Sequence, residues 1–240
     1  MDALLRRVLD ANGGLDHLRS LTSLRAKITY GGPFWEFKGH PDFAGTDVVE
    51  VSLQRQHFRQ HQVATGRTIV FDRAEDTVTV TGPDGTVVDR LEHPRESFAG
   101  FGIATGWSLA QIAYFRSYAT SHYLVEPYLF TWPGVEAHEI EPWTEAGETW
   151  RVLAVSYPTS IDVHSRIQRY YYDDASHLRR LDYEPEVNGA VPVAHYVLAD
   201  EKVNGVLVAT RREIHLRNED RTPDLSWTSI TVDLSDISIT

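Results

Sequence analysis

The sequence predicts a mainly β protein in which one long antiparallel sheet carries an N-terminal helix and an inserted helical segment. Short runs of alternating apolar and polar residues recur through most of the 240 residues. Gly, Pro, Asn or Asp separates these runs, as in antiparallel meanders. No Ser- and Pro-rich linker divides the chain, so we expect residues 1–240 to form a single domain.

The first element is a helix near residues 3–12. Apolar residues recur there at helical spacing: Leu4, Leu5, Val8 and Leu9. Asn12-Gly13-Gly14 supplies the signal that ends this helix, and residues 15–21 form one more short helical piece. Residues 24–30 alternate between apolar and polar side chains, which indicates the first strand.

Further strands are expected in two groups, on either side of a central segment. The first group covers residues 46–54, 57–63, 67–71, 77–81 and 87–91. The second group covers residues 137–143, 149–157, 166–172, 178–184, 193–199, 206–216 and 226–234. The connections are too short for the crossover helices of β-α-β units, so the strands are expected to be antiparallel.

The central segment, around residues 97–132, breaks the strand pattern and predicts a helical insertion. Residues 97–105 are rich in Gly and Ala, whereas residues 108–126 contain neither Gly nor Pro. We expect a helix over residues 108–126, capped by Ser108 and ended near Pro127.

Charge and cysteine content exclude several classes of function. The chain has 23 Lys and Arg against 34 Asp and Glu, and its formal net charge is −11. This acidic surplus repels phosphate backbones, so we expect no nucleic-acid partner. The absence of Cys excludes disulfides, Fe–S clusters and thiolate zinc sites. No Gly-rich phosphate-binding loop is present, so we expect no nucleotide and no other cofactor.

The N-terminus and the hydropathy pattern predict a cytoplasmic protein without an integral membrane segment. Arg6 and Arg7 interrupt the first apolar run after two leucines, unlike the apolar core of a secretory signal. No stretch approaches the roughly 20 apolar residues that a membrane-spanning helix needs.

Three stretches near the ends of the chain form a family-like pattern. The first helix is followed by Asn12-Gly13-Gly14-Leu15-Asp16-His17-Leu18, and a later pair of strands begins with Tyr170-Tyr171-Tyr172-Asp173. The third stretch indicates a hairpin and reads Asp200-Glu201-Lys202-Val203-Asn204-Gly205-Val206-Leu207. These stretches resemble the opening, the paired late strands and a late hairpin of the LolA/LolB-like lipoprotein-carrier superfamily.

That resemblance implies an incomplete antiparallel barrel, plugged by helices, with an apolar cavity that holds acyl chains or other lipids. The sequence differs from those carriers because it lacks a lipobox Cys and, by our expectation, a signal peptide. A shuttle between membranes is therefore not implied, whereas an apolar pocket is. We expect an apolar small molecule as ligand or substrate.

The predicted central helix carries the best candidate site. Tyr114, Tyr118, His122 and Glu126 are spaced by four residues and share one face. His122 with Glu126 can form a general base with an orienting carboxylate, and Tyr118 can donate a hydrogen bond. If the helix plugs the barrel, this face lines the cavity, and Glu126 is expected to offset burial and keep the pKa of His122 near neutrality. The alternative is ordinary packing, with the His–Glu pair at the solvent edge.

Asp162 and His164 form a second candidate pair. In an extended segment their side chains lie on one face, where the carboxylate could orient the imidazole as catalytic bases require. No nucleophile motif accompanies the pair, and the alternative, a surface loop, is favoured.

A metal site is not expected. His57 and His61 lie on a predicted strand, where four residues span about 13 Å, too far to bind one ion. They form a polar row with Arg55 and Arg59 that is expected to face solvent. The other histidines show no ligand spacing.

Two classes of function fit these observations. One is a cofactor-free enzyme, such as an isomerase, cyclase or hydrolase, that acts on a polyketide-, terpenoid- or lipid-like substrate, with His122, Glu126, Tyr118, Asp162 and His164 as catalytic candidates. The other is a binding or carrier protein for a lipid-like ligand. An enzyme requires a base and a donor that converge inside the cavity, whereas a carrier requires neither. The sequence leaves both classes open.

Overall fold

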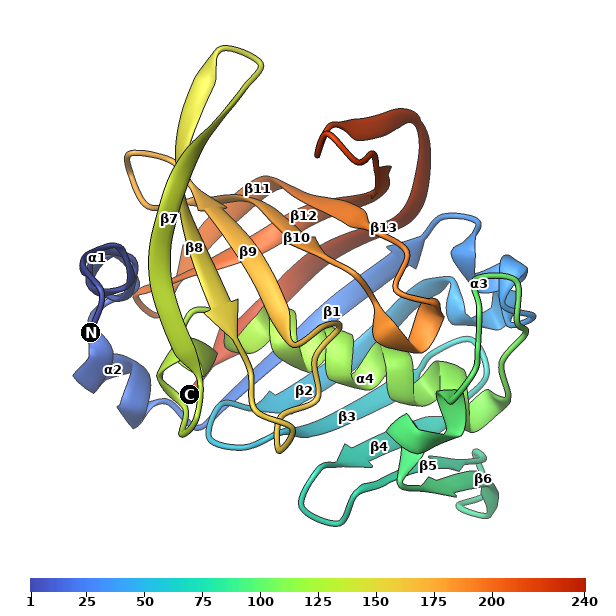
Figure 1. Ribbon diagram of the computed structural model, residues 1–240. Coiled ribbons are helices and arrows are strands. Elements are labelled where there is room, and N and C mark those ends of the chain that lie inside the picture. The colour runs from blue at the N-terminus through green and yellow to red at the C-terminus, as the bar shows by residue number, and fades with distance from the viewer.

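Thirteen antiparallel strands form one continuous, strongly curved sheet in the computed structural model, which describes residues 1–240 (Figure 1). Helices and strands of the first part are α1 (Ala3–Ala11), α2 (Leu15–Ser20), β1 (Ser23–Gly31), α3 (Phe34–Phe37), β2 (Gly45–Ser52), β3 (His57–Gln62), β4 (Thr68–Asp72), β5 (Thr77–Thr81) and β6 (Val87–Glu92). The second part contains α4 (Leu109–Val125), β7 (Glu136–Glu145), β8 (Glu148–Ser156), β9 (Ile167–Tyr172), β10 (Leu178–Tyr183), β11 (Val193–Val203), β12 (Val206–Arg217) and β13 (Pro223–Ile239). Short 3-10 turns lie at Pro41–Phe43, Pro94–Phe98, Tyr128–Thr131 and Glu186–Asn188.

The strand order is β6-β5-β4-β3-β2-β1-β13-β12-β11-β10-β9-β8-β7. Strands adjacent in the sequence therefore pair with each other, except β6 and β7, and the first strand also pairs with the last. In that pairing Leu24 lies opposite Ile239, and on its other side Leu24 lies opposite Val51. The barrel is incomplete, because β6 and β7 are edge strands that do not pair with each other.

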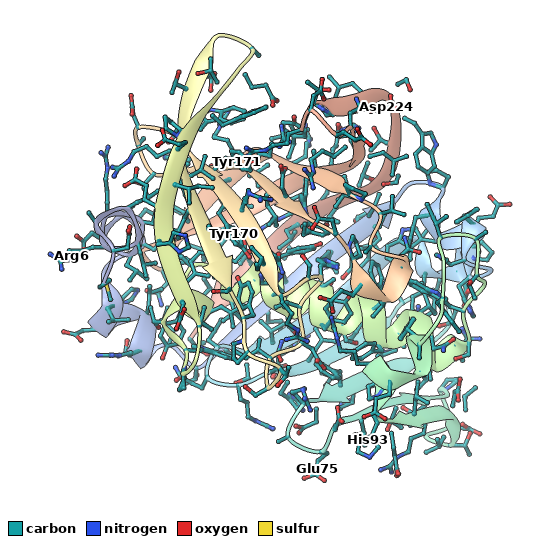
Figure 2. The ribbon with its side chains drawn as sticks, viewed as in Figure 1. Arg6, Glu75, His93, Tyr170, Tyr171 and Asp224 are labelled. Atoms are coloured by element: carbon teal, nitrogen blue, oxygen red, sulfur yellow. The ribbon has the colours of Figure 1, made fainter.

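Alternation along the strands sets the two faces of the sheet. In β1 every second residue from Leu24 to Tyr30 is buried, as the sequence predicts. Neighbouring residues on β9 show the same effect: Tyr170 packs into the main core of 51 buried residues, whereas Tyr171 packs with Trp150 and Val152 in a small cluster on the other face (Figure 2). The main core thus fills the concave side of the sheet.

Helix α4 connects the two edge strands and runs along the concave side (Figure 1). Ser108 caps it through a reciprocal pair of hydrogen bonds with Gln111, which confirms the predicted start. All of its residues are buried except Leu109 and Tyr123, which are half-buried. The helix is therefore enclosed on every side rather than amphipathic. None of the helices has the length and apolar composition needed to cross a membrane.

The predicted elements agree closely with the structure. All thirteen predicted strands and the helices near residues 3–12, 15–21 and 108–126 are present, with ends displaced by a few residues. The sequence analysis missed α3 and the 3-10 turns, because helical periodicity needs a longer run to be visible. Helix α4 and two of these turns lie within or beside the predicted insertion at residues 97–132.

Candidate functional site

An apolar pocket lies between α4 and the end of the sheet formed by β12 and β13. It has about 780 Å³ of space, counting its open mouth, and 16 of its 21 lining residues are hydrophobic. Phe115, Ala119 and Tyr123 of α4 form one wall, and Ile214 and Val232 lie on the strands opposite. Such a lining is typical of sites that bind apolar molecules.

Three hydroxyls in this wall are bonded within the protein, whereas Asn188 Oδ1 and Arg116 Nε have no partner. The hydroxyls of Tyr30 and Thr120 lie 2.8 Å apart, and the Ser229 hydroxyl donates to the carbonyl of Ile214 at 2.8 Å. Such satisfied groups can be buried against an apolar ligand without losing a hydrogen bond. The wall therefore favours apolar contact over polar recognition.

The charged residue of the wall, Arg116, is also engaged. Its guanidinium donates to the carbonyl of Phe43 at 2.5 Å and to the carboxylate of Asp47, and it lies over the Tyr30 ring, 3.8 Å from the ring centre. Both members of this ion pair are buried. Arg116 thus fixes α4 to the first half of the sheet.

A loop of residues 99–107 contributes Ile103, which is exposed, to the lining of the pocket. Lys38 holds this loop: its ammonium donates to the carbonyls of Ile103 at 2.6 Å and Thr105 at 3.1 Å. The same ammonium lies 4.4 Å from the ring centre of Trp107. No carboxylate pairs with it in the structure, and burial lowers the pKa of Lys38 to about 8.

Behind the pocket wall, a chain of hydrogen bonds crosses the protein interior. The Arg212 guanidinium lies 3.4 Å from His195 Nε2, and His195 Nδ1 lies 3.2 Å from the Tyr183 hydroxyl. That hydroxyl lies 2.8 Å from the Tyr123 hydroxyl. The chain continues from the Tyr123 hydroxyl to His164 Nε2 at 2.6 Å, and from His164 Nδ1 to the Tyr118 hydroxyl at 3.2 Å.

The direction of this chain follows from its first member. Arginine can only donate, so His195 Nε2 accepts and its Nδ1 carries the proton. His195 then donates to Tyr183, Tyr183 donates to Tyr123, and Tyr123 donates to His164. Both histidines are neutral in this arrangement, in agreement with pKa values that burial lowers well below the ordinary value.

The predicted pair of His122 and Glu126 is present at the C-terminal end of α4, with 3.3 Å between His122 Nε2 and Glu126 Oε1. The ring nitrogen makes its hydrogen bonds elsewhere, with the hydroxyls of Tyr170 at 2.7 Å and Tyr157 at 3.3 Å. The carboxyl therefore lies near the imidazole but does not orient it by a hydrogen bond. Figure 2 shows Tyr170 on the strand that crosses this end of the helix.

The expected neutral pKa of His122 is wrong. Burial, assisted by the positive charge of Arg212, lowers the pKa of His122 to about 3. Burial also raises the pKa of Glu126 to about 8, although Arg212 opposes that rise. At neutral pH the imidazole is uncharged and the carboxyl is largely protonated, so Glu126 cannot supply the negative charge that the prediction required.

The predicted face of the central helix does not line the apolar pocket. Tyr114 and Tyr118 pack in the interior, as the ordinary-packing alternative expects, but His122 is fully buried and does not lie at the solvent edge where that alternative placed it. The pocket is lined instead by a neighbouring face of α4, which includes Phe115 and Ala119. The reason is that the sheet encloses the helix on all sides, which a four-residue spacing cannot reveal.

Asp162 and His164 are both buried, so the surface-loop alternative is wrong. They do not form the expected pair either. His164 bonds to tyrosines of α4, whereas the carboxylate of Asp162 faces Arg73 at 3.4 Å. Burial raises the pKa of Asp162. The connection between β8 and β9 thus brings His164 into the hydrogen-bonded chain and turns Asp162 away from it.

Sequence reasoning missed Tyr123, Tyr183, His195 and Arg212. Tyr123 follows the predicted helix face by one residue and so points in another direction. His195 and Arg212 are at inward positions of β11 and β12, where alternation could have identified buried polar groups. Among the residues of the hydrogen-bonded chain, only Tyr123 and Tyr183 line the apolar pocket.

The polar row on β3 faces solvent, as the sequence analysis predicts. Arg59 and His61 are exposed and His57 is half-buried, so this row lies on the outer side of β3. His122, His164 and His195 lie close together in the interior, although their spacing in the sequence does not predict this. Their partners are tyrosine hydroxyls and Arg212, and no group of three His, Asp or Glu has the arrangement of a metal site.

Several solved structures have a similar fold. A LolA superfamily protein from Nitrosomonas europaea superposes with a TM-score of 0.52 at 11% identity, covering 96% of this chain and 91% of that one. The chain has a LolA-like fold. A DUF1329 family protein from Desulfovibrio piger ATCC 29098 gives 0.51 at 11% identity, covering 99% and 93%. An outer membrane lipoprotein-sorting protein domain from Vibrio parahaemolyticus gives 0.50 at 10% identity, covering 96% and 93%.

These likenesses confirm the fold-level resemblance that the sequence pattern indicates. At 10–11% identity they concern the fold alone. No protein-family model and no curated protein sequence matches the chain.

Proposed function

We propose that the protein binds an apolar, lipid-like small molecule in the pocket between α4, β12 and β13. The observation that carries this proposal is the pocket itself, with its mostly hydrophobic lining and with the hydroxyls of Tyr30, Thr120 and Ser229 bonded within the protein. Burying apolar ligand surface against such a wall is favourable because no polar group loses its partner. A similar fold in a lipoprotein-sorting domain supports the same class of ligand.

Filling the pocket is expected to abolish ligand binding. Ala119 lines the pocket from α4, and Ala119→Phe places a ring in the space the ligand needs. We expect the affinity for N-phenyl-1-naphthylamine, an uncharged apolar dye that fluoresces in apolar surroundings, to fall by at least about tenfold. Native mass spectrometry of the freshly purified variant should show loss of any ligand that the parent retains.

Two further variants make this test decisive. Ala175→Phe adds the same ring in the exposed turn between β9 and β10, and it should leave dye binding unchanged. Ile230→Trp fills the pocket from the opposite wall, in case Ala119→Phe disturbs the packing of α4. Dye binding that persists in both pocket-filling variants, with the parent's circular dichroism spectrum retained, would contradict the proposal.

A cofactor-free acid–base enzyme is the second candidate, and one observation favours it. Tyr123 and Tyr183 line the apolar pocket, and the Tyr123 hydroxyl bonds to the buried imidazole of His164. A neutral imidazole behind a hydroxyl can take up the proton that the hydroxyl receives from a substrate carbon or oxygen. The His122–Glu126 pair could act only indirectly, through other side chains, because neither residue lines this pocket.

Deuterium transfer separates the two candidates. We incubate the protein with its retained ligand in D₂O, return the extracted ligand to H₂O, and measure its mass. An isomerase or cyclase should place deuterium on ligand carbon, and Tyr123→Phe should slow this by about 100-fold or more. His122→Gln should have a smaller effect. A carrier incorporates no deuterium in any variant, which would exclude the proton-transfer reaction.

A further inference from the structure

A second pocket lies beside the apolar one, between α1, the C-terminal end of α4 and strands β9–β12. It has about 420 Å³ of space, counting its open mouth, and half of its 14 lining residues are hydrophobic. Tyr123 lines both pockets, so its side chain stands between them. Glu126, which the sequence analysis selected as a site residue, lines this second pocket and not the apolar one.

Two buried polar side chains in its wall, Glu126 and Arg212, have unused hydrogen-bonding atoms. The side chain of Glu126 is 5% exposed, and neither carboxyl oxygen has a hydrogen-bond partner. The side chain of Arg212 is 3% exposed, and its Nε has no partner. The shortest approach between them, 3.8 Å from Arg212 Nη2 to Glu126 Oε2, is too long for a hydrogen bond. Burying such groups without partners is costly.

Other polar groups of this pocket are already bonded. His177 Nδ1 contacts both carboxylate oxygens of Asp200, at 2.8 and 2.9 Å. Asn12 donates to the carbonyl of Val8 and accepts from the amide of Leu207. These groups already have hydrogen-bond partners within the protein, so Glu126 and Arg212 are the polar groups of this pocket that would gain most from a ligand.

We propose that this pocket binds a small, uncharged, hydroxylated compound, with one hydroxyl between Glu126 and Arg212. A hydroxyl can donate to a carboxyl oxygen and accept from Arg212 Nε at the same time. An ammonium group cannot accept from Arg212, and a carboxylate would bring its charge close to Asp200, which lines the same pocket. The carbon skeleton would contact the apolar half of the lining, which includes Val197 and Ala209.

Three probes with three-carbon skeletons test this assignment: glycerol, propylammonium and propionate. Each is titrated into the ¹⁵N-labelled full chain at neutral pH, to concentrations that saturate a weak, fragment-sized ligand. We expect saturable shifts of the backbone amides around residues 209–212 with glycerol and not with the two ions. Glu126→Gln should keep glycerol affinity within about threefold, because an amide both donates and accepts.

Filling the pocket supplies the matched control. Ala209→Leu adds carbon to the lining and leaves Glu126 and Arg212 in place, so glycerol affinity should fall by about tenfold or more. Val197→Phe fills the pocket from the neighbouring strand if Ala209→Leu fails to fold. Ala175→Leu, in the exposed turn, should bind like the parent.

The alternative outcomes are distinct. Saturable binding of either ion without glycerol would overturn the proposal, because the pocket would then select charge. Shifts that rise linearly with all three probes, or no shifts at all, would overturn it too, since water would then be the only partner of the buried groups. None of these outcomes affects the proposal for the apolar pocket, which is tested separately by the loss of dye binding in Ala119→Phe.

Discussion

Replacing Arg116 with Met is expected to lower the free energy of unfolding by about 3–5 kcal/mol. The pair that Arg116 forms with Asp47 is buried at both ends, with side-chain exposures of 0% and 7%. Met preserves most of the side-chain volume and removes the charge. Asp47 then keeps its bonds from Gln60 and from the amide of Val63 but loses its only cationic partner in the structure.

The size of the effect comes from the carboxylate that is left behind. A buried charge without its partner costs more than the pair contributed, because water cannot replace the lost contact. The variant also loses the contact of the guanidinium with the Tyr30 ring and its bond to the Phe43 carbonyl. Both contacts fasten α4 to the first half of the sheet, so the loss should appear in the cooperative unfolding of the whole chain.

Urea unfolding followed by Trp fluorescence measures this prediction. The double variant Arg116→Met/Asp47→Asn removes both charges and should recover about 1–2 kcal/mol relative to Arg116→Met alone. Arg59→Met, on the exposed side of β3, should change stability by less than about 0.5 kcal/mol. A loss for Arg116→Met as small as that of Arg59→Met would mean that the buried pair does not stabilise the fold.

The strands were predictable because their signal is local. Alternation over five to eleven residues identifies them, and the absence of Gly and Pro with Ser108 at the start identifies α4. The pairing of β1 with β13 joins residues more than 200 positions apart, as at Leu24 and Ile239. No local pattern carries that information, so the residues alone do not predict this pairing, and the resemblance implies only an incomplete antiparallel barrel.

Within the candidate site, the sequence predicted only contacts between residues one helical turn apart. The four-residue spacing of His122 and Glu126 brought them together as expected. Their pKa values depend on burial and on Arg212, which arrives from a strand some 90 positions later. His164 enters through a loop whose sequence looks like a surface connection. Long-range packing thus decides the chemistry of each group, and the sequence pattern names only some of the groups involved.

Acidification is expected to destabilise the protein steeply from pH 6.5 downward. Three buried histidines, His122, His164 and His195, are neutral in the folded state because burial lowers their pKa values, to about 3 for His122. In the unfolded chain each takes up a proton near its ordinary pKa of 6.5. Between these limits the unfolded state binds more protons, so stability falls as the pH falls. For His122 alone the full loss is on the order of 5 kcal/mol.

Glu126 has the opposite sign. Burial raises its pKa from 4.5 to about 8, so between these values the folded state holds a proton that the unfolded state has released. Its contribution to stability is complete below 4.5 and is lost as the pH rises through 8. The three histidines outweigh this one carboxyl below pH 6.5, and above that value Glu126 acts without opposition from them. We therefore expect maximal stability near pH 6.5, with a steep acidic limb and a shallower alkaline one.

Urea midpoints between pH 4 and 9 test both limbs with separate variants. His122→Gln keeps a hydrogen-bonding group beside Tyr170 but cannot take up the proton, so its acidic limb should be shallower by about 1.4 kcal/mol per pH unit. Glu126→Gln should flatten the alkaline limb and leave the acidic one steep. His61→Gln and Glu75→Gln change exposed residues of the same types and should reproduce the parent profile. If His122→Gln follows the parent profile as closely as His61→Gln does, His122 titrates alike in the folded and unfolded chains, and the closed, neutral environment described for it is wrong.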